Sequence, residues 1–326
     1  MINKEYLIEA INKFRACNIA IIGDLMLDKY IFGKVDRISP EAPIPIIKVE
    51  EEKYVPGGAA NVAANISTLG GNPFLHGILG NDTAKKILLE KTENLNINNH
   101  GIIVQDSKTT IQKIRIIAQN QQLLRIDYED TNYIDSYTKG QFVNKLKMHK
   151  NISVILISDY AKGTITNDLM ENIKTFAKEN NILIIADPKP LHKAFYKDVF
   201  LITPNKKEAE EMCNMKIRDT GDVEKCGKQL MNELKCNVVI TNGEKGMSVF
   251  ENGQAVEHIP TKAKEVFDVS GAGDTVVSAI ALALSSGISL KESAYLANLA
   301  AGIKVAKVGT APVCKEELIN LIETGL

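Results

Sequence analysis

The sequence lacks long apolar runs. Nowhere in its 326 residues do about 18 apolar residues follow one another, as a membrane-spanning helix requires. Residues 3–15 are polar and charged, where a secretory signal peptide would have an apolar core. These absences argue against a membrane or secreted protein, and we expect the chain to be cytoplasmic.

Cysteine pairs and excess charge are lacking as well. The five cysteines form no CxxC pair and no metal-binding spacing, and their odd number argues against a disulfide framework. The formal net charge is only −1, so there is no general electrostatic attraction to nucleic acid or to an anionic membrane. We expect neither as a partner, and any basic site must be local.

Two common nucleotide-binding motifs are also missing. No G-x-G-x-x-G follows the first apolar run, which leads into Gly23-Asp24 instead, and no Walker P-loop occurs. These absences disfavour a Rossmann dehydrogenase and a P-loop enzyme.

The sequence does contain short β-rich apolar runs with amphipathic helical patterns between them. The runs cover residues 18–22, 153–158, 182–186, 200–202 and 238–241. Strands that alternate with helices predict a mostly parallel sheet covered on both faces. We therefore predict a doubly wound α/β fold forming a single domain over residues 1–326.

Two segments break this rhythm. Residues 29–49 contain three prolines and end in an Ile/Val run, and residues 109–128 read as two strands around a turn at 119–121. The alternation Lys113-Ile114-Arg115-Ile116 suits a half-exposed antiparallel strand. We interpret the two segments as a small β lid inserted into the main domain, with ordinary surface hairpins as the alternative.

The most informative segment is 268–275, Asp-Val-Ser-Gly-Ala-Gly-Asp-Thr. It follows a strand-like run over 263–269 and precedes a helical pattern over 275–284. The two glycines allow a turn whose amides face one anion at a helix start. Asp274 could then take a proton from an attacking alcohol while these amides hold a phosphoryl group. The alternative is a glycine turn beside an ordinary aspartate.

Two further motifs are suited to binding a sugar. Asp24 and Asp28 follow the first predicted strand, where open α/β sheets bind ligands, and their carboxylates could accept hydrogen bonds from hydroxyl groups. Gly57 and Gly58 precede a helix of small residues, so that a ligand could approach the backbone and Asn61 could contact it. An acidic turn and tight helix packing are the respective alternatives.

Two motifs are suited to a nucleotide. Asn205 and Glu208 have the spacing of a helix capping box, and in a kinase the same pair could hold water on Mg²⁺ near a triphosphate. The segment 241–246 follows a strand and could line an adenine nucleotide pocket, although it is also an ordinary turn signal.

These motifs together resemble the ribokinase-like (PfkB-type) carbohydrate kinases in order and spacing. Further segments at 37–43, 56–63, 120–125, 158–163 and 187–189 resemble the kinase domain of the bacterial heptose 7-phosphate kinases, many of which continue into an adenylyltransferase domain. This resemblance covers nearly the whole chain. It implies ATP-dependent phosphorylation of D-glycero-β-D-manno-heptose 7-phosphate at its anomeric hydroxyl, for ADP-heptose and lipopolysaccharide core synthesis. It also implies a homodimer formed through the lids.

The resemblance implies a role for each motif residue. Asp274 would be the base, with an anion hole formed by Gly271, Ala272 and Gly273. The sugar would be held by Asp24, Asp28, Gly57, Gly58 and Asn61. Candidates for binding its phosphate are Arg115, Arg125, Lys162 and Lys189. ATP and Mg²⁺ would be bound by Asn205 and by Glu208, which holds the metal through water, and the nucleotide pocket would include Thr241, Gly243, Lys245 and Asn298. A monovalent cation such as K⁺ could bind near Asp268 and Ser270.

Some positions depart from the family pattern. Ser270 replaces the commoner Thr, while Pro190 and Asn242 stand where relatives often have Gly and Arg. A kinase for another sugar or sugar phosphate, such as fructose 6-phosphate, is the alternative function. A non-catalytic sugar sensor is a further alternative, which the intact Asp274 disfavours.

Overall fold

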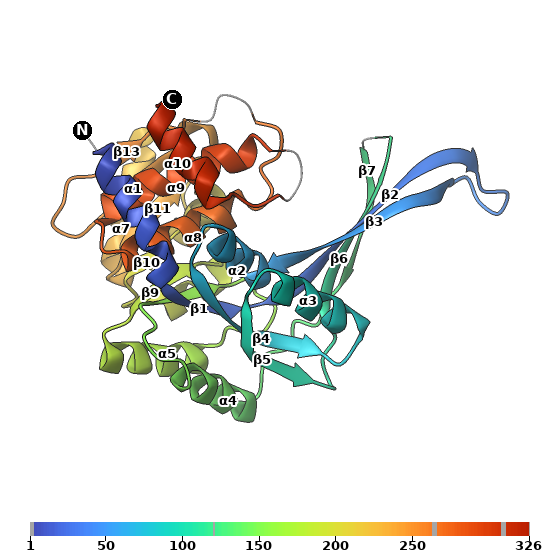
Figure 1. Cartoon of the computed structure of the whole chain (residues 1–326), viewed down its shortest axis with the longest axis horizontal. Coiled ribbons are helices and arrows are strands. Elements are labelled where there is room, and N and C mark those ends of the chain that lie inside the picture. The colour runs from blue at the N-terminus through green and yellow to red at the C-terminus, as the bar shows by residue number, and fades with distance from the viewer. Residues whose placement is uncertain (1–2, 120, 263–265, 308–310, 326) are drawn as a thin grey trace.

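The computed structural model describes residues 3–119, 121–262, 266–307 and 311–325. Helices cover both faces of one large sheet, and a second, smaller sheet projects from one side of this layered unit (Figure 1). The predicted doubly wound α/β fold with a small β lid is therefore confirmed.

The large sheet is mostly parallel. Its strands in the described residues run in the order β13-β12-β11-β10-β9-β8-β1-β4-β5. The pairs from β5 to β11 in this order are parallel, whereas β12 and β13 are added in antiparallel fashion. The strands are β1 Asn18–Gly23, β4 Asn72–Gly80, β5 Asn98–Gln105, β8 Val154–Ser158, β9 Leu183–Asp187, β10 Leu201–Ile202, β11 Asn237–Thr241, β12 Met247–Phe250 and β13 Glu257–Ile259.

The five apolar runs predicted as strands correspond to β1, β8, β9, β10 and β11. The prediction of a strand-like run over 263–269 is wrong for residues 266–269, which form a loop. Residues 263–265 lie outside the described residues. In this loop the amides of Phe267 and Asp268 donate to the Val305 carbonyl, at 2.8 and 3.3 Å. The loop is thus tied to a helix end, and its apolar side chains do not join the sheet.

Alternate side chains of the sheet pack into two cores. Ile19 and Ile21 of β1 belong to the core on one face, and Ala20 and Ile22 to the core on the other, as the period of two requires. The first core is covered by α1 Lys4–Lys13, α2 Ala59–Thr68, α3 Thr83–Asn94, α8 Ala272–Ser285, α9 Leu290–Val305 and α10 Lys315–Thr324. The second is covered by α4 Ser136–Lys147, α5 Asn167–Asn180, α6 Lys206–Cys213 and α7 Thr220–Leu234. Short 3-10 helices are η1 Phe14–Ala16, η2 Pro190–Tyr196 and η3 Gly243–Lys245.

Helix α8 lies at the centre of the first core. All its residues from Asp274 to Ala283 are buried, which fits a sequence that is small or apolar around its whole circumference. Helix α2 packs against it, and Ser278 of α8 donates to the Val62 carbonyl of α2 at 3.1 Å. This packing sets the N-terminus of α8 beside the first turn of α2.

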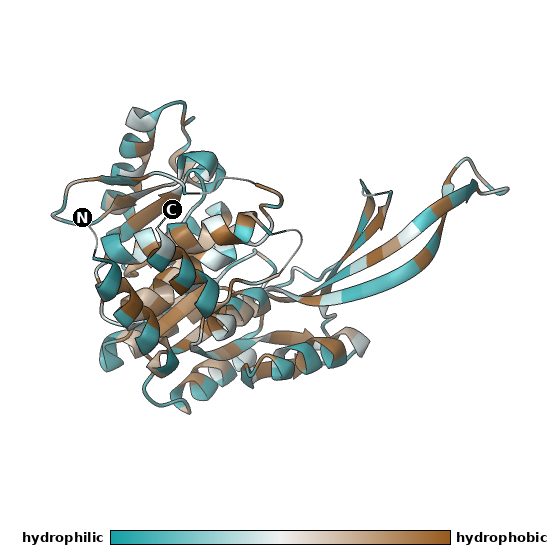
Figure 2. Cartoon of the chain, turned by 45° about the horizontal axis from the view of Figure 1, so that its top comes forward, coloured by the Kyte–Doolittle hydropathy of each residue, from teal (hydrophilic) through white to brown (hydrophobic). Residues whose placement is uncertain are grey.

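The small sheet forms the lid. Its strands are β2 Leu25–Ile38, β3 Pro45–Gly58, β6 Ile111–Ala118 and β7 Gln121–Tyr128, in the order β3-β2-β6-β7. The two outer pairs are antiparallel and the central pair β2–β6 is parallel. The strands reach further toward the main domain than the segments 29–49 and 109–128, and Asp28 and Gly57 lie on them. Asn120, in the predicted turn, lies outside the described residues. In Figure 2, stretches of the projecting strands are coloured as hydrophobic residues.

In the described part of the chain, no helix is long and apolar enough to cross a membrane. The five cysteines are free thiols: Cys17, Cys213, Cys226 and Cys236 are buried and Cys314 is exposed.

Candidate active site

Helix α8 begins at the predicted anion-binding motif. Its N-cap is Gly271, whose φ of 75° lies in the left-handed region that favours glycine. The amide of Ala272 donates to the Val269 carbonyl at 3.2 Å, which stabilises the turn. A helix N-terminus with glycines at its first positions is a favourable place for a phosphoryl group.

Asp274 lies in the first turn of α8 and is 8% exposed. Its Oδ2 accepts a 2.5 Å hydrogen bond from the Asn61 side-chain amide, and its Oδ1 accepts a 2.7 Å hydrogen bond from the Tyr160 hydroxyl. Burial raises the pKa of Asp274 above its ordinary value, and the two hydrogen bonds act in the opposite direction. The carboxylate is thus oriented on both oxygens, as a general base must be.

The diglycine before α2 allows a close approach of backbones. Gly58 has a φ of 56°, and a Cβ there would lie 2.4 Å from the Asp24 carbonyl oxygen. A Cβ on Gly57 would lie 2.5 Å from the Asp28 carboxylate. Glycine is therefore required at position 58 by the backbone, whereas a Cβ at position 57 would displace side chains. The two residues lead into α2, whose Asn61 reaches Asp274.

A cavity of about 160 Å³ opens beside Asp274. Seven predicted site residues line it: Asp28, Gly58, Asn61, Arg115, Ser270, Gly271 and Asp274. The other lining residues are Met26, Tyr30, Pro56, Lys113, Tyr160 and Lys304. The main domain and the lid both contribute to this wall, so the site lies where they meet.

The lid brings cations to the cavity. Arg115 donates to Asp28 at 2.5 Å and lies 5.1 Å from the centre of the Tyr30 ring. Register explains this contact, because Tyr30 of β2 is paired with Arg115 of β6. Lys113 lies on the same strand, two residues away and on the same face, with its ammonium 5.6 Å from the Tyr160 ring. Burial lowers the pKa of Lys113.

Asp24 lies behind the cavity wall. It is fully buried and is not among the residues that line the cavity. Its carboxylate accepts hydrogen bonds from the amides of Tyr160, Lys162 and Thr164, at 2.9, 3.0 and 3.1 Å. Burial raises the pKa of Asp24. In this structure Asp24 holds the loop that follows β8, and its contact with the sugar stays a prediction.

Of the four basic residues predicted to bind the sugar phosphate, three do not line the cavity, namely Arg125, Lys162 and Lys189. Lys162 forms a 2.6 Å ion pair with Glu129 and faces a different pocket. Arg125 forms a two-pronged pair with Asp127 of its own strand, at 2.9 Å for each contact, and is half exposed. Sequence spacing does not determine which basic side chain forms an ion pair outside the cavity.

The predicted nucleotide residues lie along the same edge of the sheet. Asn205 and Glu208 form a full capping box at the start of α6, with both reciprocal hydrogen bonds at 3.0 Å. Thr241 ends β11 and pairs with Asn205, while Gly243 and Lys245 form η3 directly after it. Asn298 of α9 is buried and donates to the Pro260 carbonyl at 2.8 Å.

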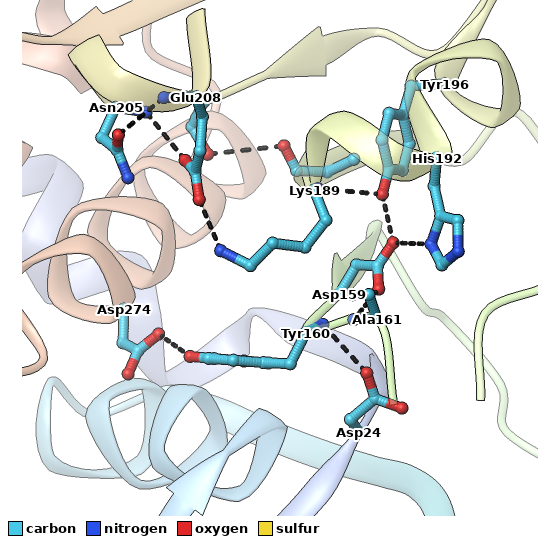
Figure 3. A network of polar contacts seen from close by, with 12 residues as sticks. Asp24, Asp159, Tyr160, Ala161, Lys189, His192, Tyr196, Asn205, Glu208 and Asp274 are labelled. Carbon is cyan, nitrogen blue, oxygen red and sulfur yellow. Dashed lines mark hydrogen bonds and ion pairs between the residues drawn. The ribbon is translucent and has the colours of Figure 1, made fainter. Parts of the chain in front are cut away.

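Lys189 links the two halves of the site. Its ammonium forms an ion pair with Glu208 and lies 5.6 Å from the Tyr160 ring (Figure 3). Burial opposes its charge, but the Glu208 carboxylate raises the pKa of Lys189 above its ordinary value. Lys189 therefore stands between the sugar cavity and the capping-box element of α6.

A buried polar network supports Tyr160 from behind. Asp159 accepts hydrogen bonds from the Tyr196 hydroxyl and, at 2.7 Å, from the Ala161 amide, and its Oδ2 lies 2.6 Å from Nδ1 of His192. Figure 3 shows Tyr160 reaching from its amide contact with Asp24 to Asp274. Sequence spacing does not reveal this network, because His192 and Tyr196 lie 33 and 37 positions from Asp159.

Few oxygen ligands for a metal ion or a monovalent cation lie together in the described part of the chain. Among the described residues, no group of three or more His, Cys, Asp and Glu side chains could hold a metal ion. The predicted cation residues Asp268 and Ser270 are neighbours in the loop before α8, and the Ser270 amide donates to Asp268 Oδ1 at 2.8 Å.

The geometry described above is that of a sugar-phosphorylating enzyme, and comparison with known proteins agrees. The profile of the pfkB family carbohydrate kinases matches residues 17–317. The chain belongs to this family, and the predicted class of enzyme, an ATP-dependent carbohydrate kinase, is confirmed.

Among curated proteins, the chain is similar to several that carry the name bifunctional protein HldE. It is 42% identical to that of Geobacter sulfurreducens over 307 residues, which are 94% of this chain and 63% of the relative. It is also 42% identical to that of Histophilus somni over 313 residues, which are 95% of this chain and 64% of the relative. The chain thus spans less than two thirds of the length of these relatives.

Solved structures share the ribokinase-like fold. Arabidopsis thaliana ribokinase complexed with ribose and ATP superimposes with a TM-score of 0.76 at 18% identity, covering 94% of this chain and 98% of that one. Escherichia coli phosphofructokinase-2 in complex with substrates and products gives 0.77 at 19% identity, covering 94% and 99%.

Proposed function

We propose that the chain transfers the γ-phosphoryl group of ATP to the anomeric hydroxyl of D-glycero-β-D-manno-heptose 7-phosphate. The product would be the 1,7-bisphosphate, used for ADP-heptose and lipopolysaccharide core synthesis in the cytoplasm, where ATP is available. The observation that carries this proposal is the cavity itself, which is lined by an oriented Asp274 together with Lys113 and Arg115 of the lid. An acceptor that carries its own phosphate matches this arrangement of base and cations.

In the proposed reaction, Asp274 accepts the proton of the acceptor hydroxyl as the oxygen attacks the γ-phosphorus. A carboxylate has about four lone-pair sites, so Asp274 can accept this proton while it still accepts hydrogen bonds from Asn61 and Tyr160. The bond from the γ-phosphorus to the bridging oxygen of ADP breaks, and the start of α8 stabilises the charge on the transferred group. Burial that raises the pKa of Asp274 makes it a stronger base.

The capping-box element is suited to the triphosphate and its metal. Mg²⁺, when bound, neutralises charge on the β- and γ-phosphates. Glu208 is oriented for a water-mediated contact because Asn205 binds one of its carboxylate oxygens and Lys189 the other. We assign the nucleotide to Thr241, Gly243, Lys245 and Asn298 on the same edge. A solved structure of E. coli phosphofructokinase-2 is in complex with potassium.

We further propose that two chains associate through their lids. Strand β7 is exposed along its whole length and forms an edge of the lid sheet. Large apolar side chains are exposed on the lid, namely Ile38, Ile44, Val49, Leu123, Leu124, Ile126 and Tyr128. An unpaired strand edge with exposed apolar groups favours pairing with a second copy.

A panel of acceptors tests the substrate. We expect ATP consumption with heptose 7-phosphate and far lower kcat/KM with unphosphorylated heptose. Equal efficiency on the two would contradict the phosphate-binding role of the cavity. A higher kcat/KM for fructose 6-phosphate would support the alternative sugar kinase.

A further inference from the structure

The cavity contains a lysine that neither the proposed reaction nor the motifs account for. Lys304 lies in the last turn of α9 and is only 2% exposed, yet it lines the cavity together with Ser270, Gly271 and Asp274. Its Cε lies 3.6 Å from the position that a Cβ on Gly271 would take. The side chain therefore ends directly beside the turn that begins α8.

Oxygen atoms compensate the charge of this buried ammonium. Its Nζ donates to the Ala311 carbonyl at 3.1 Å. Burial lowers the pKa of Lys304, and the nearby charge of Lys307 acts in the same direction, while the carboxylates of Asp268 and Asp274 favour the charged form. The C-terminal end of α9 adds partial negative charge from its carbonyl groups. A buried charge needs such compensation.

The same region is tied to the anion-binding turn. The Val305 carbonyl at the end of α9 accepts the amides of Phe267 and Asp268, so the helix end and the loop before α8 are one unit. A cation held here lies next to the N-terminus of α8 and can add to its positive potential. It also neutralises the carboxylate of Asp268, which would otherwise repel a phosphoryl group.

Carbonyl and carboxylate oxygens are the ligands that a potassium ion takes. In this chain the ammonium of Lys304 already occupies their neighbourhood, and a second positive charge beside it would be repelled. The predicted K⁺ site at Asp268 and Ser270 therefore does not fit the residues present. We propose that the Lys304 ammonium takes the place of the monovalent cation, so that phosphoryl transfer does not depend on potassium.

This inference rests on the carbohydrate-kinase activity but not on the identity of the sugar. We would measure turnover in potassium chloride and in tetramethylammonium chloride at equal ionic strength, with any acceptor from the panel that is phosphorylated. The wild type is expected to have the same rate in both salts. Lys304→Met is expected to lose roughly 100-fold in tetramethylammonium chloride, as for the loss of one transition-state donor, and to recover in potassium chloride.

Lys307→Met is the matched control. Lys307 is also a lysine near the end of α9, but it contacts the Pro312 carbonyl and Glu317 and does not line the cavity. We expect its rate to be equal in the two salts. A large activation of the wild type by potassium would overturn the proposal even if Lys304→Met failed to fold.

Thermal melts without nucleotide or sugar give a second measurement that is independent of the acceptor. Potassium should raise the Tm of Lys304→Met more than that of the wild type, because the variant lacks the positive charge that repels the ion. A Lys304→Met enzyme that is fully active without potassium, or inactive and not restored by it, would show that the ammonium does not replace a cation.

Discussion

The hydroxyl of Tyr160 donates a 2.7 Å hydrogen bond to the carboxylate of Asp274, although the two residues are 114 positions apart in the chain. The aromatic ring also has the ammonium groups of Lys113 and Lys189 over it, each at 5.6 Å. Tyr160 thus connects Asp274, the proposed base, to a lysine of the lid and to a lysine that pairs with Glu208. Its place in the site makes it a positioning residue for the reaction.

Replacing Tyr160 with Phe should change the pH dependence of the reaction. The hydrogen bond from Tyr160 lowers the pKa of Asp274, so its loss raises that pKa further. Because the base must be unprotonated, the acid limb of the kcat/KM profile should move to higher pH. A profile that keeps its acid limb while the rate falls uniformly would contradict this role.

Asp274→Asn should abolish most turnover, because the substitution keeps the shape of the side chain and removes the base. We expect a loss of about two to four orders of magnitude in kcat. Nucleotide affinity, measured by calorimetry, should stay within a few-fold of the wild type. Near-normal turnover would exclude Asp274 as the base.

Arg115 and Arg125 face each other across β6 and β7 and form a natural comparison. Arg115→Ala removes a cation from the cavity wall and should weaken productive binding of the sugar phosphate by about 1 to 3 kcal/mol, measured as kcat/KM. Arg125 is paired with Asp127 and half exposed, so Arg125→Ala should have a smaller effect. Equal losses in the two variants, or unchanged kinetics in both, would contradict this assignment, and thermal melts would exclude unfolding as the cause.

Asp159→Asn should destabilise the fold, because it weakens buried contacts with His192, Tyr196 and the Ala161 amide at once. Loss of hydrogen bonds to a charged group costs about 1.5 to 3 kcal/mol in the free energy of unfolding, measured by urea titration. Asp168→Asn is the control, since its ion pair with Lys139 is largely exposed on the aspartate side and should contribute below about 1 kcal/mol. Similar losses of unfolding free energy in both variants would show that the buried network stabilises the fold no more than an exposed ion pair does.

Leu124→Lys should disrupt a dimer formed through the lids, because Leu124 is 53% exposed on the edge strand β7. Sedimentation velocity should then show a monomer where the wild type is a dimer. Met148→Lys, at an exposed position after α4, should leave the dimer intact. A wild type that is monomeric at all concentrations would refute lid pairing.

Local patterns determined much of the molecule without any tertiary information. Asn205 and Glu208 are three residues apart, and their reciprocal capping bonds need only the first turn of α6. The small and apolar run of α8 likewise predicted a helix, and the alternation in β6 predicted a lid strand. Each of these features depends on neighbours within a few residues, so the sequence alone was sufficient for them.

Only the tertiary structure decided which of the chemically similar side chains reach the site. Asp24 and Asp28 stand four residues apart in one motif. The buried carboxylate of Asp24 accepts hydrogen bonds from three backbone amides, whereas Asp28 lines the cavity. Lys162 and Lys304 are equally charged, but the first pairs with Glu129 and the second is enclosed beside Gly271. The partner that compensates a charge comes from a distant strand or helix, so the position of that charge depends on how the whole sheet and lid are assembled.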